Sequence, residues 1–266
     1  MLSAATLFDL TAFAHRQVFA PTAPVWQALT DLKTYMDSYS YPQYDPSILP
    51  IGRPLPETII LYQGQAMTDT DCTIGYGDTS KGGLVVHRNG EILIGATVLM
   101  AGAILVGQRL AFGAGVLVEP GAMIKSPAII GDCSEIRQTA YLRGYCLAGQ
   151  RCVLGHATEI KNSIFLNDAK AGHFAYLGDS ILGTNVNLGA GTKFANLRFL
   201  PGTIILRYGS ERIDTGRRKF GAILGDDCQT GCNSVTSPGT VLGKASMLMP
   251  NATAPSGYHP ERSLLR

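Results

Sequence analysis

Between residues 94 and 166 every sixth residue is apolar. The members of this series are Ile94, Met100, Val106, Phe112, Val118, Ile124, Ile130, Ile136, Leu142, Ala148, Leu154, Ile160 and Leu166. With 45% of the chain apolar, chance gives such a series about once in thirty thousand trials at one phase. A six-residue period fits neither an α-helix nor a single strand, and it is typical of a chain that turns a corner after each short strand. The pattern predicts an all-β fold, a left-handed parallel β-helix with one aliphatic side chain per face pointing inward.

The remainder of the chain predicts additions to this solenoid. Residues 1–55 form a helical and irregular N-terminal arm, since apolar residues recur there at helical spacing at Val25, Leu29, Leu32 and Met36. Residues 56–91 contain short strand-like pieces, which we expect to start or cap the solenoid because a terminal coil exposes unpaired backbone groups. The solenoid covers 92–254, and 255–266 form a tail.

Two irregularities interrupt the six-residue register. After Leu166 the phase slips through steps of five residues, and such slips re-aim side chains, so this part of the chain is a good place for a site. Residues 195–222 then break the register entirely, and it resumes at Leu224. We interpret this insertion as a β-hairpin or long loop. It is rich in arginine, and it could meet the phosphates of a ligand or simply be a solvated loop.

Composition excludes several functional classes. A net charge of +2 gives no overall attraction to nucleic acid. The uncharged run 92–107 is shorter than the ~20 residues of a membrane span, so we expect no membrane association. The six cysteines are dispersed, and the N-terminus has no signal-peptide pattern, which predicts reduced thiols and a cytoplasmic protein. Of the five histidines only His156 and His173 lie about one coil apart, so no metal site is expected.

Arg143 and Lys161 are separated by 18 residues, the length of one three-faced coil. Each directly follows an inward position, so both are predicted to point outward from the same face, one above the other. Two stacked cations repel each other unless an anion lies between them. They therefore indicate either an anion site or a solvated basic ladder.

A motif of higher specificity follows them. The stretch Gly172-His173-Phe174-Ala175-Tyr176-Leu177-Gly178-Asp179-Ser180 precedes Asn187-Leu188-Gly189-Ala190-Gly191-Thr192 and then Asn196. This block resembles the acetyltransferase domain of the bifunctional glucosamine-1-phosphate acetyltransferase / N-acetylglucosamine-1-phosphate uridylyltransferases. NLRF at 196–199 and GRRKFGAILGD at 216–226 are similar to the archaeal-type sugar-1-phosphate nucleotidylyltransferase/acetyltransferase branch.

The resemblance implies roles for individual residues. It implies that His173 is the general base, and that Arg143, Lys161, Tyr176 and Asn187 bind the sugar and its phosphate. It places Ala190, Asn196, Cys232 and, two residues out of register, Lys219 in the region that receives acetyl-CoA. It further implies a homotrimer with sites between neighbouring subunits, and no metal at the acetyl-transfer site.

The resemblance covers the acetyltransferase half of that family alone. No L-x-x-G-x-G-T-R-M-x-P-x-x-K-type signature occurs, and about 90 residues before the solenoid are too few for a nucleotide-binding domain, so uridylyltransferase activity is not expected. The sequence therefore predicts an acetyl-CoA-dependent N-acetyltransferase acting on an amino-sugar 1-phosphate. The alternative is a non-catalytic β-helix protein that binds a sugar phosphate or nucleotide sugar, or regulates through it.

The predicted chemistry suits the residues of the block. Acetyl transfer to an amine requires a base that accepts a proton near neutral pH, which an imidazole does. A dianionic phosphate would relieve the repulsion between Arg143 and Lys161 through charge-assisted hydrogen bonds. Asp179 either orients His173 or caps a corner of the coil, and we favour the corner. Tyr176 either adds a hydroxyl to the phosphate or is a half-buried aromatic residue.

Overall fold

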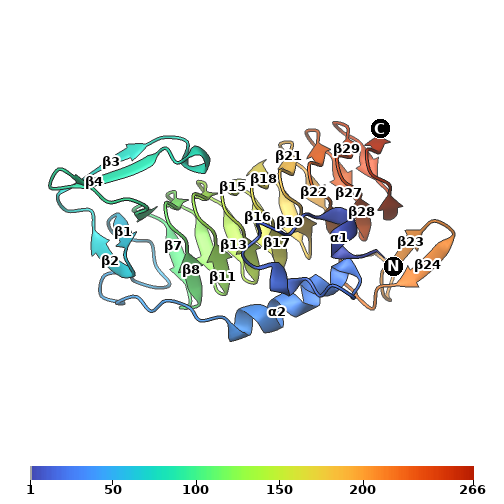
Figure 1. Cartoon of the computed structure of the whole chain (residues 1–266), viewed down its shortest axis with the longest axis horizontal. Helices are drawn as coiled ribbons and strands as arrows, with labels where there is room; N and C mark the ends of the chain where they lie inside the picture. The colour runs from blue at the N-terminus through green and yellow to red at the C-terminus, as the bar shows by residue number, and fades with distance from the viewer. Residues whose placement is uncertain (1) are drawn as a thin grey trace.

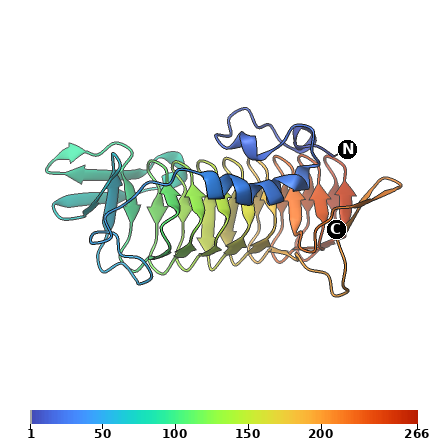
Figure 2. The same ribbon diagram turned by 90° about the horizontal axis from the view of Figure 1, so that it is seen from below.

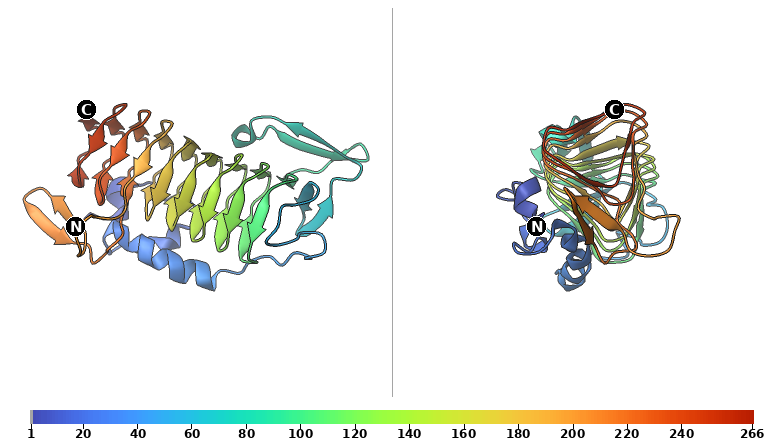
Figure 3. Two further views of the ribbon diagram at one scale, coloured as in Figure 1. Left: turned by 180° about the vertical axis from the view of Figure 1, so that it is seen from behind. Right: turned by 90° about the vertical axis from the view of Figure 1, so that its right-hand side faces the viewer.

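The protein is a parallel β-helix of triangular cross-section, seen from the side in Figure 1 and along its length in Figure 3. The computed structural model describes residues 2–266. Three parallel sheets form the sides of the prism, and we call them face 1, face 2 and face 3 in the order in which each coil visits them. The fold class predicted from the six-residue period is confirmed, including the short helical segment at the N-terminus.

Each face stacks one strand from every coil. Face 1 contains, in spatial order, β2 (Gln65–Thr68), β1 (Ile59–Tyr62), β6 (Thr97–Leu99), β9 (Leu117–Val118), β12 (Glu135–Ile136), β15 (Val153–His156), β18 (Lys170–His173), β21 (Asn187–Leu188), β26 (Gln229–Thr230), β29 (Met247–Leu248) and β32 (Leu264–Leu265). Face 2 contains β7 (Ile104–Val106), β10 (Met123–Lys125), β13 (Tyr141–Arg143), β16 (Glu159–Lys161), β19 (Tyr176–Gly178), β22 (Lys193–Phe194), β27 (Val235–Thr236) and β30 (Thr253–Ala254). Face 3 contains β8 (Leu110–Phe112), β11 (Ala128–Ile130), β14 (Cys146–Ala148), β17 (Ser163–Phe165), β20 (Ile181–Leu182), β25 (Ala222–Leu224), β28 (Thr240–Leu242) and β31 (Gly257–His259).

The inward series begins differently from the prediction. Ile94 is 83% exposed, and Leu99 and Leu105 fill the interior where Met100 and Val106 were expected. The six-residue assignment was wrong here because the first strands pair with the next coil at 19-residue rather than 18-residue steps. One extra residue per coil shifts the register and turns the neighbouring side chain outward.

The phase slip lies earlier than expected, at the corner between face 2 and face 3. From Leu142 to Ala148 the inward positions are six residues apart, but from Ile160 to Phe165 they are five apart. Leu166, the last member of the predicted series, is buried outside the prism, against the N-terminal arm. The shortened corner therefore lies beside Lys161, one of the two predicted anion-binding cations.

The chain before the solenoid covers one end and one side of it. Strand β1 pairs antiparallel with β6 and with β2, which closes the first coil. Strands β3 (Cys72–Tyr76), β4 (Leu84–Arg88) and β5 (Glu91–Ile92) form a separate antiparallel sheet, seen above the first coils in Figure 1. The loop between β3 and β4 reaches back over face 1, where the Thr79 N–H donates to Glu135 at 3.0 Å.

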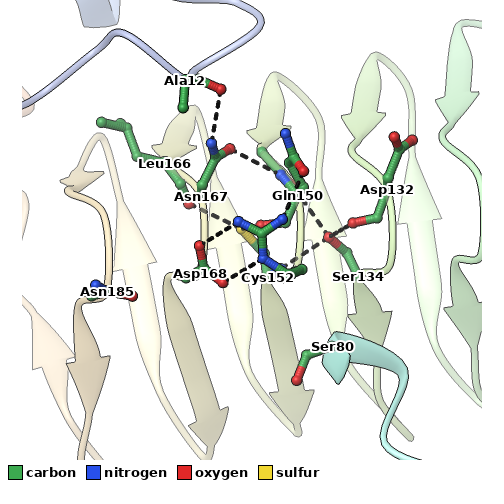
Figure 4. Close-up of polar contacts among 12 residues, drawn as sticks. Ala12, Ser80, Asp132, Ser134, Gln150, Cys152, Leu166, Asn167, Asp168 and Asn185 are labelled. Carbon is green, nitrogen blue, oxygen red and sulfur yellow. Dashed lines mark hydrogen bonds and ion pairs between the residues drawn. The ribbon is translucent and has the colours of Figure 1, made fainter. Parts of the chain in front are cut away.

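The N-terminal arm lies along face 3. It includes α1 (Ala4–Leu7), a 3₁₀ turn at Val25–Gln27 and α2 (Ala28–Ser38), which runs beside the solenoid in Figure 2. Its apolar side packs on the outward residues of face 3 in one cluster: Leu7, Phe8, Trp26, Leu29, Leu32 and Met36 against Ile129, Leu147, Ile164, Ile181 and Ile223. Polar contacts add to this, as when Asn167 donates to the Ala12 carbonyl at 3.0 Å and accepts from the Gln150 N–H (Figure 4).

The insertion and the C-terminus complete the fold. Residues 195–221 leave the face 2–face 3 corner and form a hairpin of β23 (Ile205–Tyr208) and β24 (Glu211–Asp214), which projects near the C-terminal end in Figure 1. The last residues were expected as a tail, but β31 and β32 continue the solenoid because they pair in parallel with the preceding coil. Within residues 2–266 no helix is both long and apolar enough to cross a bilayer.

The arm contributes to stability by covering apolar surface of face 3. Leu29 is 0% exposed, so Leu29→Ala should lower the free energy of unfolding by about 2–5 kcal/mol, as buried leucine deletions do. Urea denaturation followed by circular dichroism measures this change. Thr34→Ala, on the exposed side of the same helix, is the control. Equal midpoints for the two variants would show that the arm is not part of the cooperative unit.

Candidate functional site

A basic pocket lies at the corner between face 2 and face 3. It has a volume of about 800 Å³ and six cations line it: Lys33, Arg143, Lys161, Arg217, Arg218 and Lys219. The single acidic residue in its lining is Asp179. Three parts of the chain contribute, namely α2, the coil corners after β13, β16 and β19, and the end of the insertion. This arrangement gives an anion several donors within one chain.

Arg143 and Lys161 stand on successive turns, as their spacing predicted. Their preceding residues, Leu142 and Ile160, are paired in the parallel ladder of face 2. Arg143 donates to Glu159 at 2.6 Å, so part of its charge is compensated. Burial lowers the pKa of Lys161; nearby Lys219 and Arg143 lower it further, while Asp179 opposes the shift. An anion in this pocket would remove that repulsion.

Asp179 organises the floor of the basic pocket. Its carboxylate accepts hydrogen bonds from the side chains of Asn162 at 2.9 Å and Asn196 at 2.8 Å, and Arg217 approaches it to 3.6 Å. Asp179 sits at the corner after β19 with a positive φ of 52°. It therefore acts at a corner, the role that we favoured, and His173 is not among its partners.

The sequence did not predict that α2 and Arg217 belong to this pocket. Arg217 donates to the Thr30 hydroxyl at 2.6 Å, so it ties the insertion to the N-terminal helix. Burial lowers its pKa, and the Asp179 carboxylate opposes that shift. Lys33 lines the pocket from the next turn of α2. No periodicity in the sequence relates the arm to the insertion, because contact between them depends on how the arm docks.

Tyr176 and Asn196 adjoin the pocket without lining it. The Tyr176 hydroxyl lies 3.4 Å from the Asn196 side-chain oxygen. Burial raises the pKa of Tyr176, and the carboxylates of Glu159 and Asp179 raise it further. Asn196, expected to contact acetyl-CoA, is held here by Asp179 and Tyr176. Lys219, also expected near acetyl-CoA, lies instead in the basic pocket with Arg143 and Lys161.

His173 lies at a different corner, between face 1 and face 2. It ends β18 and stacks on His156, which ends β15, with ring centroids 5.4 Å apart and planes at 20°. Burial lowers the pKa of His173, and the neighbouring His156 and Arg137 lower it further. The imidazole is exposed, so it can meet a ligand from outside the prism.

Two of the four residues expected to receive acetyl-CoA, Ala190 and Cys232, follow along this same corner. Ala190 lies one coil further on, where the Gly191 N–H donates to the His173 carbonyl at 3.0 Å. Cys232 lies one coil beyond that, with an exposed free thiol. Asn187 is exposed at the start of β21 on face 1. A track of candidate residues thus runs from His173 toward the C-terminal end.

A single chain does not bring His173 into the basic pocket. His173 precedes β19, whereas Lys161 pairs with Gly178, the last residue of that strand. The two corners are therefore separated by the width of face 2. The expected juxtaposition of the imidazole with the two cations needs a second copy of the chain. Among residues 2–266 no group of three or more His, Cys, Asp or Glu is arranged to hold a metal ion.

The sequence comparisons agree with the resemblance of the motif block. A bifunctional sugar-1-phosphate nucleotidylyltransferase/acetyltransferase from Sulfurisphaera tokodaii is 37% identical over 153 residues, which is 51% of this chain and 38% of that protein. The bifunctional protein GlmU of Methanococcus aeolicus is 34% identical over 158 residues, 59% of this chain and 37% of that protein. The predicted resemblance to these bifunctional proteins is confirmed. This chain spans less than two fifths of the length of either relative.

Two further comparisons add little. No family model matches the chain. The crystal structure of a mutant of perosamine N-acetyltransferase from Caulobacter crescentus, in complex with CoA and GDP-perosamine, is 17% identical. It covers 62% of this chain and 55% of that protein with a TM-score of 0.30, a likeness too weak to carry an argument.

The close approach of β15 and β18 sets the stacking of the two histidines. A Cβ on Gly155 would overlap the carbonyl oxygen of Gly172 in the next coil, whereas a Cβ on Gly172 would meet nothing within 4 Å. Gly155→Ala should therefore force the coils apart beside His156 and lower the melting temperature by several degrees. Gly172→Ala is the matched control, and its melting temperature should stay within about one degree of the wild-type value. Differential scanning calorimetry of both variants tests this, and equal melting temperatures would contradict it.

Proposed function

We propose that this protein is an acetyl-CoA-dependent N-acetyltransferase that acts on an amino-sugar 1-phosphate of the glucosamine or galactosamine type. The observation that carries the proposal is the basic pocket, in which Arg143 and Lys161 occupy adjacent turns and four more cations surround them. The similarity to proteins named sugar-1-phosphate nucleotidylyltransferase/acetyltransferase supports the choice of reaction.

In this proposal the basic pocket binds the phosphate of the sugar. A sugar phosphate carries up to two negative charges, and the six cations of the pocket exceed the single Asp179 by more than enough to balance them. Arginine presents a planar fork of donors to phosphate oxygens, and lysine adds a compact positive charge. Holding the phosphate also fixes the position of the amine, so the pocket contributes orientation as well as affinity.

His173 is the proposed general base. The amine nitrogen attacks the thioester carbonyl carbon, a C–N bond forms, and His173 accepts the proton that the nitrogen loses. The tetrahedral intermediate then collapses, the C–S bond breaks, and the CoA thiolate leaves and takes up the proton that His173 accepted, which restores the neutral imidazole. A base must be neutral before the reaction, and the lowered pKa of His173 favours the neutral form of the imidazole.

The proposal requires a homotrimer in which neighbouring copies share a site. His173 and the basic pocket lie at opposite edges of face 2, so the imidazole would act on a phosphate-bound sugar held by an adjacent copy. Phe174, next to His173, is 61% exposed, and Phe199 and Leu200 on the insertion are also exposed. Apolar side chains of this size beside a polar site favour contact with another protein surface.

Release of CoA thiol from acetyl-CoA tests the reaction with glucosamine 1-phosphate and galactosamine 1-phosphate. His173→Ala should lower the rate by about 10²–10⁴-fold, because the general base is lost. His87→Ala, in the β3–β4 hairpin, is the control and should retain the wild-type rate. If wild type and His173→Ala are equally inactive on both sugars while the protein binds them, the alternative of a non-catalytic sugar-phosphate-binding protein replaces this proposal.

The pH dependence of kcat/KM follows from the lowered pKa of His173. Neutral imidazole is the active form, so the rate should fall as pH drops through that pKa, with a midpoint below the ordinary value of about 6.5. His156→Gln removes one group that lowers the pKa, so the acidic midpoint should move to higher pH. An unchanged midpoint in His156→Gln would show that the stacked ring does not influence the base.

A further inference from the structure

A second basic pocket lies on the other side of the insertion. It has a volume of about 400 Å³ and is lined by Arg198, Arg207 and Arg212 together with Ile204, Ile205, Ser237, Pro238, Pro255 and Ser256. We call it the arginine pocket. None of these lining residues is acidic. The pocket lies on the same face 2–face 3 corner as the basic pocket, two coils closer to the C-terminus.

The register of the hairpin places two of these arginines directly opposite each other. Arg207 of β23 and Arg212 of β24 are cross-strand partners, so their side chains leave the same side of the hairpin. Like charges in that position destabilise a hairpin unless an anion lies between them. Within residues 2–266 no ion pair involves Arg198, Arg207 or Arg212, so each guanidinium retains donors for a ligand.

One carboxylate of the hairpin, that of Asp214, lies on the same side as the two paired arginines. Asp214 shares the side of Arg212, and its carboxylate accepts from the Gly216 N–H at 2.9 Å. That bond and one from the Thr203 hydroxyl lower the pKa of Asp214. Glu211 alternates to the opposite side of the strand. The Asp214 carboxylate keeps its negative charge, so one acid on the hairpin faces the three arginines and a net positive charge remains at the arginine pocket.

The hairpin packs on the solenoid through its apolar side. On that side, opposite the paired arginines, Leu206 is 0% exposed, and the Tyr208 ring packs 5.2 Å from the Tyr258 ring of β31. At its base the Thr215 hydroxyl donates to the Ile204 carbonyl at 2.7 Å. A site whose side chains are already held in place loses little conformational entropy when an anion binds.

We propose that the arginine pocket is a second anion site, which binds a phosphate or pyrophosphate group of an organic ligand. Three arginines and two serines line it, together with proline and isoleucine residues that are apolar. It is separate from the basic pocket, because the insertion stands between the two. It also lies across face 2 from Ala190 and Cys232, so within one chain it is not part of the track beside His173. The inference does not depend on acetyl transfer.

Calorimetric titration of the full chain with inorganic pyrophosphate, CoA, dephospho-CoA and UDP tests the site. Pyrophosphate can occupy both the basic pocket and the arginine pocket, and in Arg207→Ala/Arg212→Ala the affinity of one of the two sites should fall at least tenfold, because two charge-assisted partners are lost. Arg207→Lys/Arg212→Lys retains the charge, so its affinity for pyrophosphate should fall less than that of the alanine variant. Arg16→Ala/Arg53→Ala removes the same charge elsewhere and should bind as wild type. If Arg207→Ala/Arg212→Ala also loses affinity for CoA but not for dephospho-CoA, the site binds the 3′-phosphate of CoA. If the variant loses affinity for UDP, the site binds a nucleoside diphosphate.

Two outcomes would overturn the proposal. One is that wild type binds none of the four ligands. The other is that Arg207→Ala/Arg212→Ala binds all of them within twofold of the Arg16→Ala/Arg53→Ala control, with Arg143→Ala/Lys161→Ala abolishing binding. Circular dichroism and thermal melting of each variant show whether the hairpin remains folded. If arginine-dependent binding occurs but no acetyl transfer is found, the arginine pocket stands and the proposed reaction fails.

Discussion

Stacking of inward aliphatic side chains in the interior of the prism is the interaction on which the remainder of this structure depends. Leu142, Ile160 and Leu177 lie on one another in successive coils, each with 0% exposure. Each such side chain contributes about 1.5–3 kcal/mol when fully buried. This column of stacked inward side chains fixes the register of the strands, and the register determines which outward side chains become neighbours.

The two candidate sites are consequences of that register combined with a local departure from it. The step between inward positions shortens to five residues from Ile160 to Phe165 and again from Leu177 to Leu182. These two tight corners hold Asn162 and Asp179, respectively, at positive φ. The carboxylate of Asp179 then gathers Asn196 and Arg217 from the insertion. The shortened corners thus lie at the basic pocket, and Asp179 attaches to it the segment that supplies three of its six cations.

The N-terminal arm has two roles in the same region. Its apolar side covers the outward isoleucine and leucine side chains of face 3, which would otherwise be exposed. Its polar side supplies Thr30 and Lys33 to the basic pocket, so the packing of face 3 and the lining of this pocket depend on one docking event. The insertion has a comparable double use, since Arg217–Lys219 serve the basic pocket and Arg198, Arg207 and Arg212 serve the arginine pocket.

The sequence by itself determined the parallel β-helix, the outward stacking of Arg143 and Lys161, and the position of the insertion, because a repeat of six residues encodes one strand and one corner. The six-residue pattern assigned the wrong first inward residues and put the phase slip too late in the chain. A coil that is one residue longer or shorter leaves the apolar pattern almost unchanged, so the pattern does not reveal it. Only the tertiary structure decided that α2 reaches the pocket of Arg143 and that His173 faces a different corner. Those relations join segments far apart in the chain, and they depend on docking and on the width of a face, which no local spacing encodes.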